Sequence, residues 1–123
     1  MGKGEVFMVK RRIAVATDGK NGAEDFVSNV FGRARTFTIV DVEDEKIIKV
    51  SVLENPALVY AHGAGPIAIK TLVDDGIEVV LASELGIGAS DILKQHKILY
   101  VQAEPGTKVV DAVKKIGVQV EQS

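Results

Sequence analysis

The chain has 123 residues, of which 46% are hydrophobic and 26% are charged, a balance that is typical of one globular domain and excludes a disordered chain. Its formal net charge of −2 gives no general attraction to nucleic acid or to an anionic membrane, and no apolar stretch approaches the roughly 20 residues of a membrane span. Because it contains no cysteine, which fits a cytoplasmic protein, any metal must be held by histidine, carboxylate or backbone groups, or arrive inside a preassembled cofactor.

Residues 1–11 are predicted to be a loose leader, and residues 12–123 a single α/β domain. The basic cluster at residues 10–12 is interpreted as the solvated start of a strand rather than as a nucleic-acid patch. That strand is predicted over residues 12–17, an apolar run rich in β-branched residues, which Asp18 and Gly19 close with a turn.

A long loop is predicted over residues 20–34, with at most one helical turn, at residues 26–31. Residues 36–42 and 46–53 then alternate between apolar and polar side chains, with a tight turn between them. This pattern predicts a β-hairpin, and Asn55 and Pro56 stop its second strand.

The rest of the chain alternates between helices and strands. Helices are predicted over residues 66–75, 89–95 and 108–116, and strands over residues 78–82 and 98–102. Pro66 is expected as the first residue of its helix, Gly76 as the residue that follows its C-cap, and Thr107 as the N-cap of the last helix. His96 is interpreted as a structural residue. For residues 118–120, both an edge strand and a loose end are compatible with the sequence.

This order of elements predicts an α/β fold with three layers, in which a mixed five-stranded sheet has helices on both faces. A short connection makes the second strand antiparallel to the first, and each helical crossover then returns the chain to a strand parallel to the first. The glycine-containing loops would then meet at the carboxyl ends of the parallel strands, where open α/β sheets bind ligands. A crossover helix within residues 23–31 would invert the hairpin and weaken this convergence.

The loops at this edge form the predicted binding site. Their glycines leave room for a bulky ligand, and helix N-termini with one arginine favour anionic or oxygen-rich groups. A histidine adds a potential metal ligand. The predicted site residues are Asp18, Phe31, Gly32, Arg33, His62, Gly63, Ala64, Gly65, Gly86, Gly88 and Thr107, with His62 as the metal ligand.

Catalytic arrangements are not recognisable in the sequence. The glycine-rich turns lack the lysine of a phosphate-binding loop and the full spacing of a dinucleotide fingerprint. Asp18, Asp41 and Glu84 are conceivable as the carboxylates of a metal-dependent nuclease or hydrolase. Asp41, however, belongs towards the other end of the sheet, so the three are not expected to meet.

A resemblance to a known family rests on five segments: IAVATDG, VFGRARTF, ENPA, HGAGP opening a helix, and LGIGASDIL after a strand. In this order, over residues 12–116, the chain resembles the dinitrogenase iron-molybdenum cofactor biosynthesis family. The resemblance implies a ribonuclease-H-like α/β fold without the nuclease carboxylates of that fold. It also implies a non-enzymatic role, because characterised members bind the iron-molybdenum cofactor or its iron-sulfur precursor and carry it between assembly proteins.

Members of the family usually have histidine immediately before Phe-Gly-Arg and often cysteine shortly after it, where this chain has Val30 and Ala34. The resemblance therefore leaves His62 as the one obvious soft ligand at the edge. Two hypotheses stay open beside the hydrolase: a carrier of a metal cofactor, with cofactor-assembly proteins as partners, or a regulatory domain that binds a small phosphorylated or carboxylated ligand.

Overall fold

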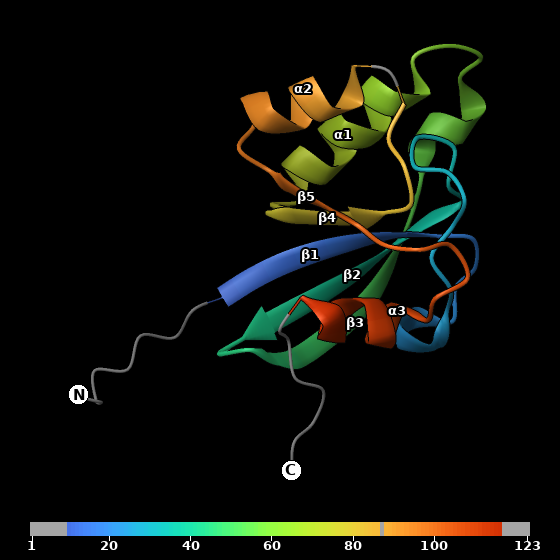
Figure 1. Ribbon diagram of the computed structural model, residues 1–123. Coiled ribbons are helices and arrows are strands. Elements are labelled where there is room, and N and C mark those ends of the chain that lie inside the picture. Colours follow the sequence, from blue (N-terminus) through green and yellow to red (C-terminus); the bar gives the residue numbers. More distant parts are fainter. Residues whose placement is uncertain (1–9, 87, 117–123) are drawn as a thin grey trace.

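A five-stranded sheet forms the middle of the molecule in the computed structural model, which describes residues 10–86 and 88–116 (Figure 1). The strands are β1 (Lys10–Thr17), β2 (Thr36–Glu43), β3 (Lys46–Glu54), β4 (Val79–Ala82) and β5 (Leu99–Gln102). They lie in the order β3-β2-β1-β4-β5, with β1 antiparallel to β2 and parallel to β4. The prediction of a mixed sheet, including the direction of each strand, is confirmed.

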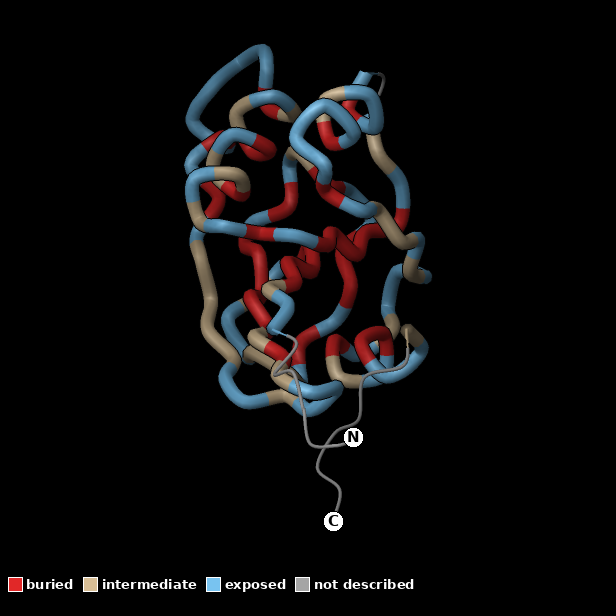
Figure 2. Tube along the Cα trace, turned by 90° about the vertical axis from the view of Figure 1, so that its left-hand side faces the viewer, coloured by how far each residue is buried: buried red, intermediate tan, exposed pale blue. Residues whose placement is uncertain are grey.

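Helices cover both faces of this sheet, and in the described part of the chain they are α1 (Ala64–Asp74), α2 (Ala89–Gln95) and α3 (Val109–Lys115). Figure 1 shows α1 and α2 on one face and α3 on the other. β1 supplies both cores, because Ala14 and Ala16 are packed in the cluster with α1 and α2, and Ile13 and Val15 in the cluster with α3. Figure 2 shows the buried residues gathered along the central strands and the inner sides of the helices. The three-layer α/β architecture is therefore confirmed.

The start of α1 differs from the prediction. The helix begins at Ala64 rather than Pro66, with Gly63 as N-cap at φ 77°, and its first hydrogen bond runs from the Ile67 N–H to the Gly63 carbonyl. Pro66 is thus the third helical residue. It fits there because the first N–H groups of a helix have no intrahelical partner, so any of these positions tolerates proline.

The N-cap of α3 was also predicted wrongly. Lys108, not Thr107, precedes the helix, and the first helical bond joins the Ala112 N–H to the Lys108 carbonyl. The Thr107 carbonyl instead accepts the N–H of Val27. The chain before α3 is therefore held by a distant loop, which sets where the helix starts.

The loop after β1 contains no helical turn at residues 26–31, which corrects the sequence-based placement. A short 3-10 helix, η1 (Gly22–Glu24), comes earlier, and the chain then runs extended. Val27 forms a bridge with Thr17, and the Ser28 N–H donates to the Ala16 carbonyl. Backbone groups that are bound in this way cannot close a helical turn, so the hairpin keeps its predicted direction.

β1 begins two residues before its predicted start, because Lys10 and Arg11 pair with Glu43 and Val42 of β2. These two residues, assigned above to a leader, thus belong to the sheet. Residues 1–9 and the tail at 118–120 lie outside the described residues. Within residues 10–86 and 88–116, none of the helices has the length and apolar character needed to cross a membrane.

Two helix ends offer a direct test of backbone strain. Gly76 after α1 and Lys97 after α2 take the same position and the same left-handed conformation, at φ 76° and φ 60°. Because a side chain disfavours this conformation, we expect Lys97→Gly to raise the free energy of unfolding by about 1 kcal/mol, measured by urea denaturation. Gly76→Ala is the matched control and should lower the free energy of unfolding by a similar amount. If both substitutions changed the free energy of unfolding in the same direction, this explanation would be wrong.

Candidate functional site

A hollow of about 360 Å³ lies beyond the carboxyl ends of β1 and β4. Its walls are residues 29–33, the start of α1, and residues 84–86. We call it the hollow, and its lining consists of Asn29, Val30, Phe31, Gly32, Arg33, Ala64, Gly65, Glu84, Leu85 and Gly86. The structure thus brings together Phe31, Gly32, Arg33, Ala64, Gly65 and Gly86 from the predicted site.

The turn at residues 31–34 lies directly against the first turn of α1. A Cβ added to Gly32 would stand only 3.0 Å from the Cα and the N of Gly65. The Arg33 side chain reaches further along the same segment, where its Nη2 donates to the Ala61 carbonyl at 2.9 Å. Two motifs that lie about thirty residues apart in the sequence therefore form one continuous wall.

Phe31 fixes this turn to the core. Its side chain is only 2% exposed, and its ring packs against Phe37 of β2 at a centroid distance of 5.6 Å and an interplanar angle of 55°. Phe31 borders the hollow, but most of its surface contacts protein. Its observed role is to anchor the turn that carries Gly32 and Arg33.

The opposite wall follows β4 and is held by side chains of β5. The Tyr100 hydroxyl donates to the carbonyls of Ala82 and Ser83 at 3.2 and 3.3 Å, and the Gln102 amide donates to the Ser83 carbonyl at 3.1 Å. Burial, and to a smaller extent the charge of Glu84, raises the pKa of Tyr100. The hydroxyl therefore stays protonated at neutral pH and remains a donor to the end of β4.

The other predicted residues lie at the same edge but outside the lining. His62 is exposed, and Gly63 and Gly88 are the left-handed N-caps of α1 and α2. Asp18 lines a neighbouring pocket with Arg35 and the ion pair of Lys20 and Glu54. In that pair the hydrogen bond from Lys20 lowers the pKa of Glu54.

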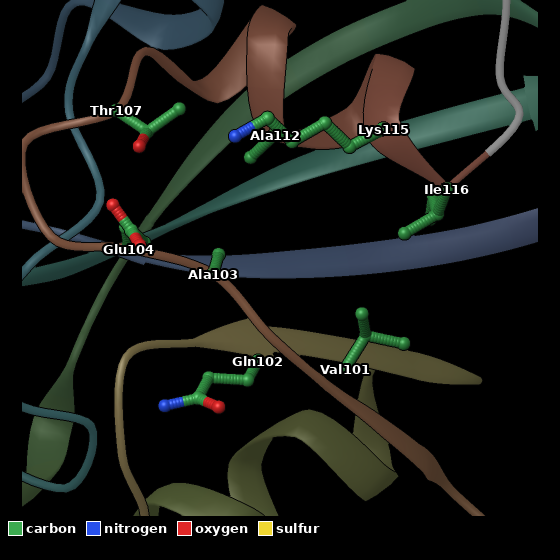
Figure 3. A pocket seen from close by; sticks show the side chains of 8 residues that line it. All are labelled: Val101, Gln102, Ala103, Glu104, Thr107, Ala112, Lys115 and Ile116. Carbon is green, nitrogen blue, oxygen red and sulfur yellow. The ribbon is translucent and has the colours of Figure 1, made fainter.

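Thr107 lies in a third pocket, between the end of β5 and α3, as Figure 3 shows. This pocket has a volume of about 210 Å³, an apolar floor that includes Val101 and Ile116, and Glu104 and Lys115 among its polar lining. It shares no residue with the lining of the hollow. The predicted site is therefore divided among three places along one edge of the sheet.

The carboxylates of the hydrolase hypothesis do not meet. Asp41 lies towards the start of β1, where Arg12 binds both of its oxygens at 2.8 and 2.9 Å. Asp18 follows the other end of β1, and Glu84 borders the hollow. Asp41 thus belongs to an ion-pair network with Arg12 and Asp75 that ties β1 and β2 to the end of α1.

The donor set of the hollow fits a preassembled group better than a single metal ion. Among the residues that the structure describes, no group of three or more histidine and carboxylate side chains is placed to hold a metal. Arg33, by contrast, uses one of its N–H groups on Ala61 and leaves others for a ligand. This wall therefore offers N–H donors to an anionic group, with the carboxylate of Glu84 on the opposite wall.

Comparison with known proteins identifies the family. The model of the family described as "Dinitrogenase iron-molybdenum cofactor" matches residues 11–119. The chain belongs to this family, which confirms the resemblance found in the sequence.

Two solved structures are similar to the chain in fold and in sequence. The apo form of the orange protein from Desulfovibrio gigas is 30% identical, with a TM-score of 0.77 and 86% of each chain covered. A Thermotoga protein provisionally named NifB, solved by NMR, is 34% identical, with a TM-score of 0.71 and 86% of each chain covered. The fold and roughly 30–34% of the aligned residues are thus shared with these proteins.

A curated relative is an uncharacterised protein of Methanocaldococcus jannaschii, 29% identical over 65 residues. The match covers 53% of this chain and 55% of that protein, so the chain spans about half the length of the relative.

Proposed function

We propose that this chain is a non-enzymatic binding or carrier domain for a preassembled metal cofactor, of the iron-molybdenum type or its iron-sulfur precursor, held at the hollow. The observation that carries the proposal is a pair of glycines that the fold itself does not require. Gly65 and Gly86 both line the hollow, and neither has a left-handed φ. Among the described residues, a Cβ added to either would meet no atom within 4 Å apart from its chain neighbours and, for Gly65, the backbone of its own helix.

A glycine without a conformational or packing reason weakens a fold. In the first turn of α1, Gly65 costs up to about 0.5–1 kcal/mol relative to alanine, because glycine loses more conformational freedom on folding. A bulky ligand lying directly on the backbone of both walls explains why the side chains are absent. Membership of the dinitrogenase iron-molybdenum cofactor family supports the choice of ligand.

The residues around the glycines define how such a group would be held. Arg33 and the unpaired N–H groups at the start of α1 would contact anionic or sulfide atoms. His62, one residue beyond the carbonyl that Arg33 binds, would supply a single ligand from the rim. Cofactor-assembly proteins would be the partners that deliver and receive the group.

Anaerobic incubation with Fe²⁺ and sulfide, with and without molybdate, tests the proposal. After gel filtration, we expect iron to remain on the unmodified protein at a defined ratio and to be largely lost from Arg33→Ala. His62→Ala should change the visible spectrum of the bound material more than the amount of iron. Equal iron on all three proteins would contradict the placement at the hollow.

Gly65→Ala separates binding from stability. We expect the alanine to fill the hollow and reduce iron retention, while the midpoint of thermal unfolding stays the same or rises by a few degrees. Ser90→Ala is the matched control, because Ser90 holds the same second position in α2 and does not line the hollow. A Gly65→Ala protein that retains as much iron as the Ser90→Ala protein would contradict the argument from the glycines.

The small anionic ligand remains a second candidate, because Arg33 would serve a phosphate or carboxylate equally well. If the unmodified protein retains no metal but its unfolding temperature rises with phosphate or citrate and not in Arg33→Ala, this candidate replaces the first.

A further inference from the structure

Asn55 is a buried polar side chain that binds the turn at residues 31–34, and it lines the neighbouring pocket of Asp18 rather than the hollow. It is only 5% exposed and follows the last residue of β3. Its Nδ2 donates to the Gly32 carbonyl at 2.9 Å and to the Ala34 carbonyl at 2.8 Å, and its Oδ1 accepts the Ala57 N–H at 2.9 Å. These partners fix the orientation of the amide, because carbonyls require the donor end and an N–H requires the acceptor end.

One planar amide therefore holds two segments at a fixed distance from each other. The donor end binds the carbonyls on either side of Arg33, and the acceptor end caps the 3-10 helix η2 (Pro56–Val59), which leads towards Ala61. Arg33 and Ala61 are themselves joined by a hydrogen bond. A movement of the Asn55 amide would thus displace both ends of that contact.

We propose that Asn55 is a positioning residue, whose side chain sets where the Arg33 guanidinium lies at the hollow and thereby sets the affinity for the ligand. The inference rests on the proposed function, since it assigns to Asn55 the geometry of the same site. Asn55 is absent from the lining of the hollow, so it acts through Arg33 rather than by touching the ligand.

Asn55→Asp removes the donor end and keeps the acceptor end. A carboxylate can still accept the Ala57 N–H, but it places negative charge against the carbonyls of Gly32 and Ala34. Asn55→Ala removes both ends. Thr17→Val is the matched control for lost stability, because the Thr17 hydroxyl is fully buried, contacts Thr36 and Thr38 at 2.6 and 3.0 Å, and lies outside the hollow.

The first measurement needs no ligand. In ¹⁵N-labelled protein, at a temperature where circular dichroism shows each variant to be folded, Asn55→Asp should shift the amide resonances of Arg33 and Gly65. The resonance of Val101, in the distant strand β5, should stay in place. Unchanged resonances of Arg33 and Gly65 would overturn the proposal, whether or not the protein binds metal.

The second measurement is a double-mutant cycle on iron retention after incubation with sulfide and with Fe²⁺ concentrations raised until the weakly binding Arg33→Ala protein is also half-saturated. Asn55→Asp should raise the half-saturating iron concentration about tenfold in the native background and about twofold or less in the Arg33→Ala background. Thr17→Val should leave it unchanged.

The outcomes of the cycle separate the two proposals. Failure of the unmodified protein to retain iron would refute the proposed function and leave the resonance test to decide on Asn55. Retention by the unmodified protein, with an equal loss from Asn55→Asp in both backgrounds, would refute the role of Asn55 and leave the proposed function standing.

Discussion

Replacing Gly32 by alanine is expected to lower the free energy of unfolding by about 1–3 kcal/mol and to abolish iron retention at the hollow. The added Cβ would lie 3.0 Å from the Cα and N of Gly65 and 3.4 Å from the carbonyl carbon of Ala64. These are backbone atoms of α1, which cannot rotate away as a side chain can. The turn and the helix would have to separate, against the hydrogen bond that holds the Gly32 carbonyl to Asn55.

The conformation of Gly32 makes this a clean test of contact. Its φ is not left-handed, so alanine is allowed there and the expected loss comes from packing alone. Urea denaturation measures the stability and metal analysis the retention. Gly86→Ala is the matched control, because its Cβ would meet no atom of the described residues within 4 Å apart from its chain neighbours, so it should reduce retention without lowering stability. If the two variants had the same free energy of unfolding, the backbone of the turn at Gly32 would not be in close contact with α1.

The sheet was predictable because its signals are local. The alternation of residues 36–42 and 46–53, and the apolar runs of β1 and β4, mark strands wherever they occur in a sequence. Short loops and right-handed crossovers then leave few arrangements, and the observed one is among them. The start of α2 was predicted at the observed residue, Ala89. The starts of α1 and α3 were predicted less well, because proline is tolerated at several early helical positions and the start of α3 depends on a bond from Val27 to Thr107.

For the site, the sequence predicted the edge of the sheet at which it lies, but not which residues line one pocket. Five strands spaced about 4.8 Å apart make an edge about 19 Å wide, so residues that share it need not share a pocket. Asp18 and Thr107 lie at that edge beside other pockets, while Arg33 and Gly65 meet in the hollow. The directions of the strands do not determine which of the loops at this edge contact one another.

Asn55 shows what the sequence pattern hides. In the sequence it precedes proline at the end of a strand, which indicates a stop and nothing more. In the structure its amide reaches carbonyl groups 23 and 21 residues earlier in the chain. A signal was present, because Asn55 belongs to one of the segments that carry the family resemblance, but the role of the residue depends on tertiary contacts.

Phe31→Ala should produce the largest loss of stability among these variants, about 3–5 kcal/mol, because it removes a ring that is 98% buried against Phe37 and the α1 side of the core. Such a loss is a large share of the 5–15 kcal/mol that stabilises a typical domain. The hollow borders the vacated space, so water can enter it and the loss should fall towards the lower end of that range.

Phe26→Ala is the control that isolates this effect. Phe26 lies in the same loop, but its side chain is 48% exposed, so its removal should change the free energy of unfolding by no more than about 0.5 kcal/mol. Iron retention, measured at a temperature where both variants are folded, should fall for Phe31→Ala and persist for Phe26→Ala. If Phe31→Ala retains as much iron as Phe26→Ala, the turn at residues 31–34 keeps its position without the Phe31 ring. The binding surface would then not depend on the packing of the core beneath it.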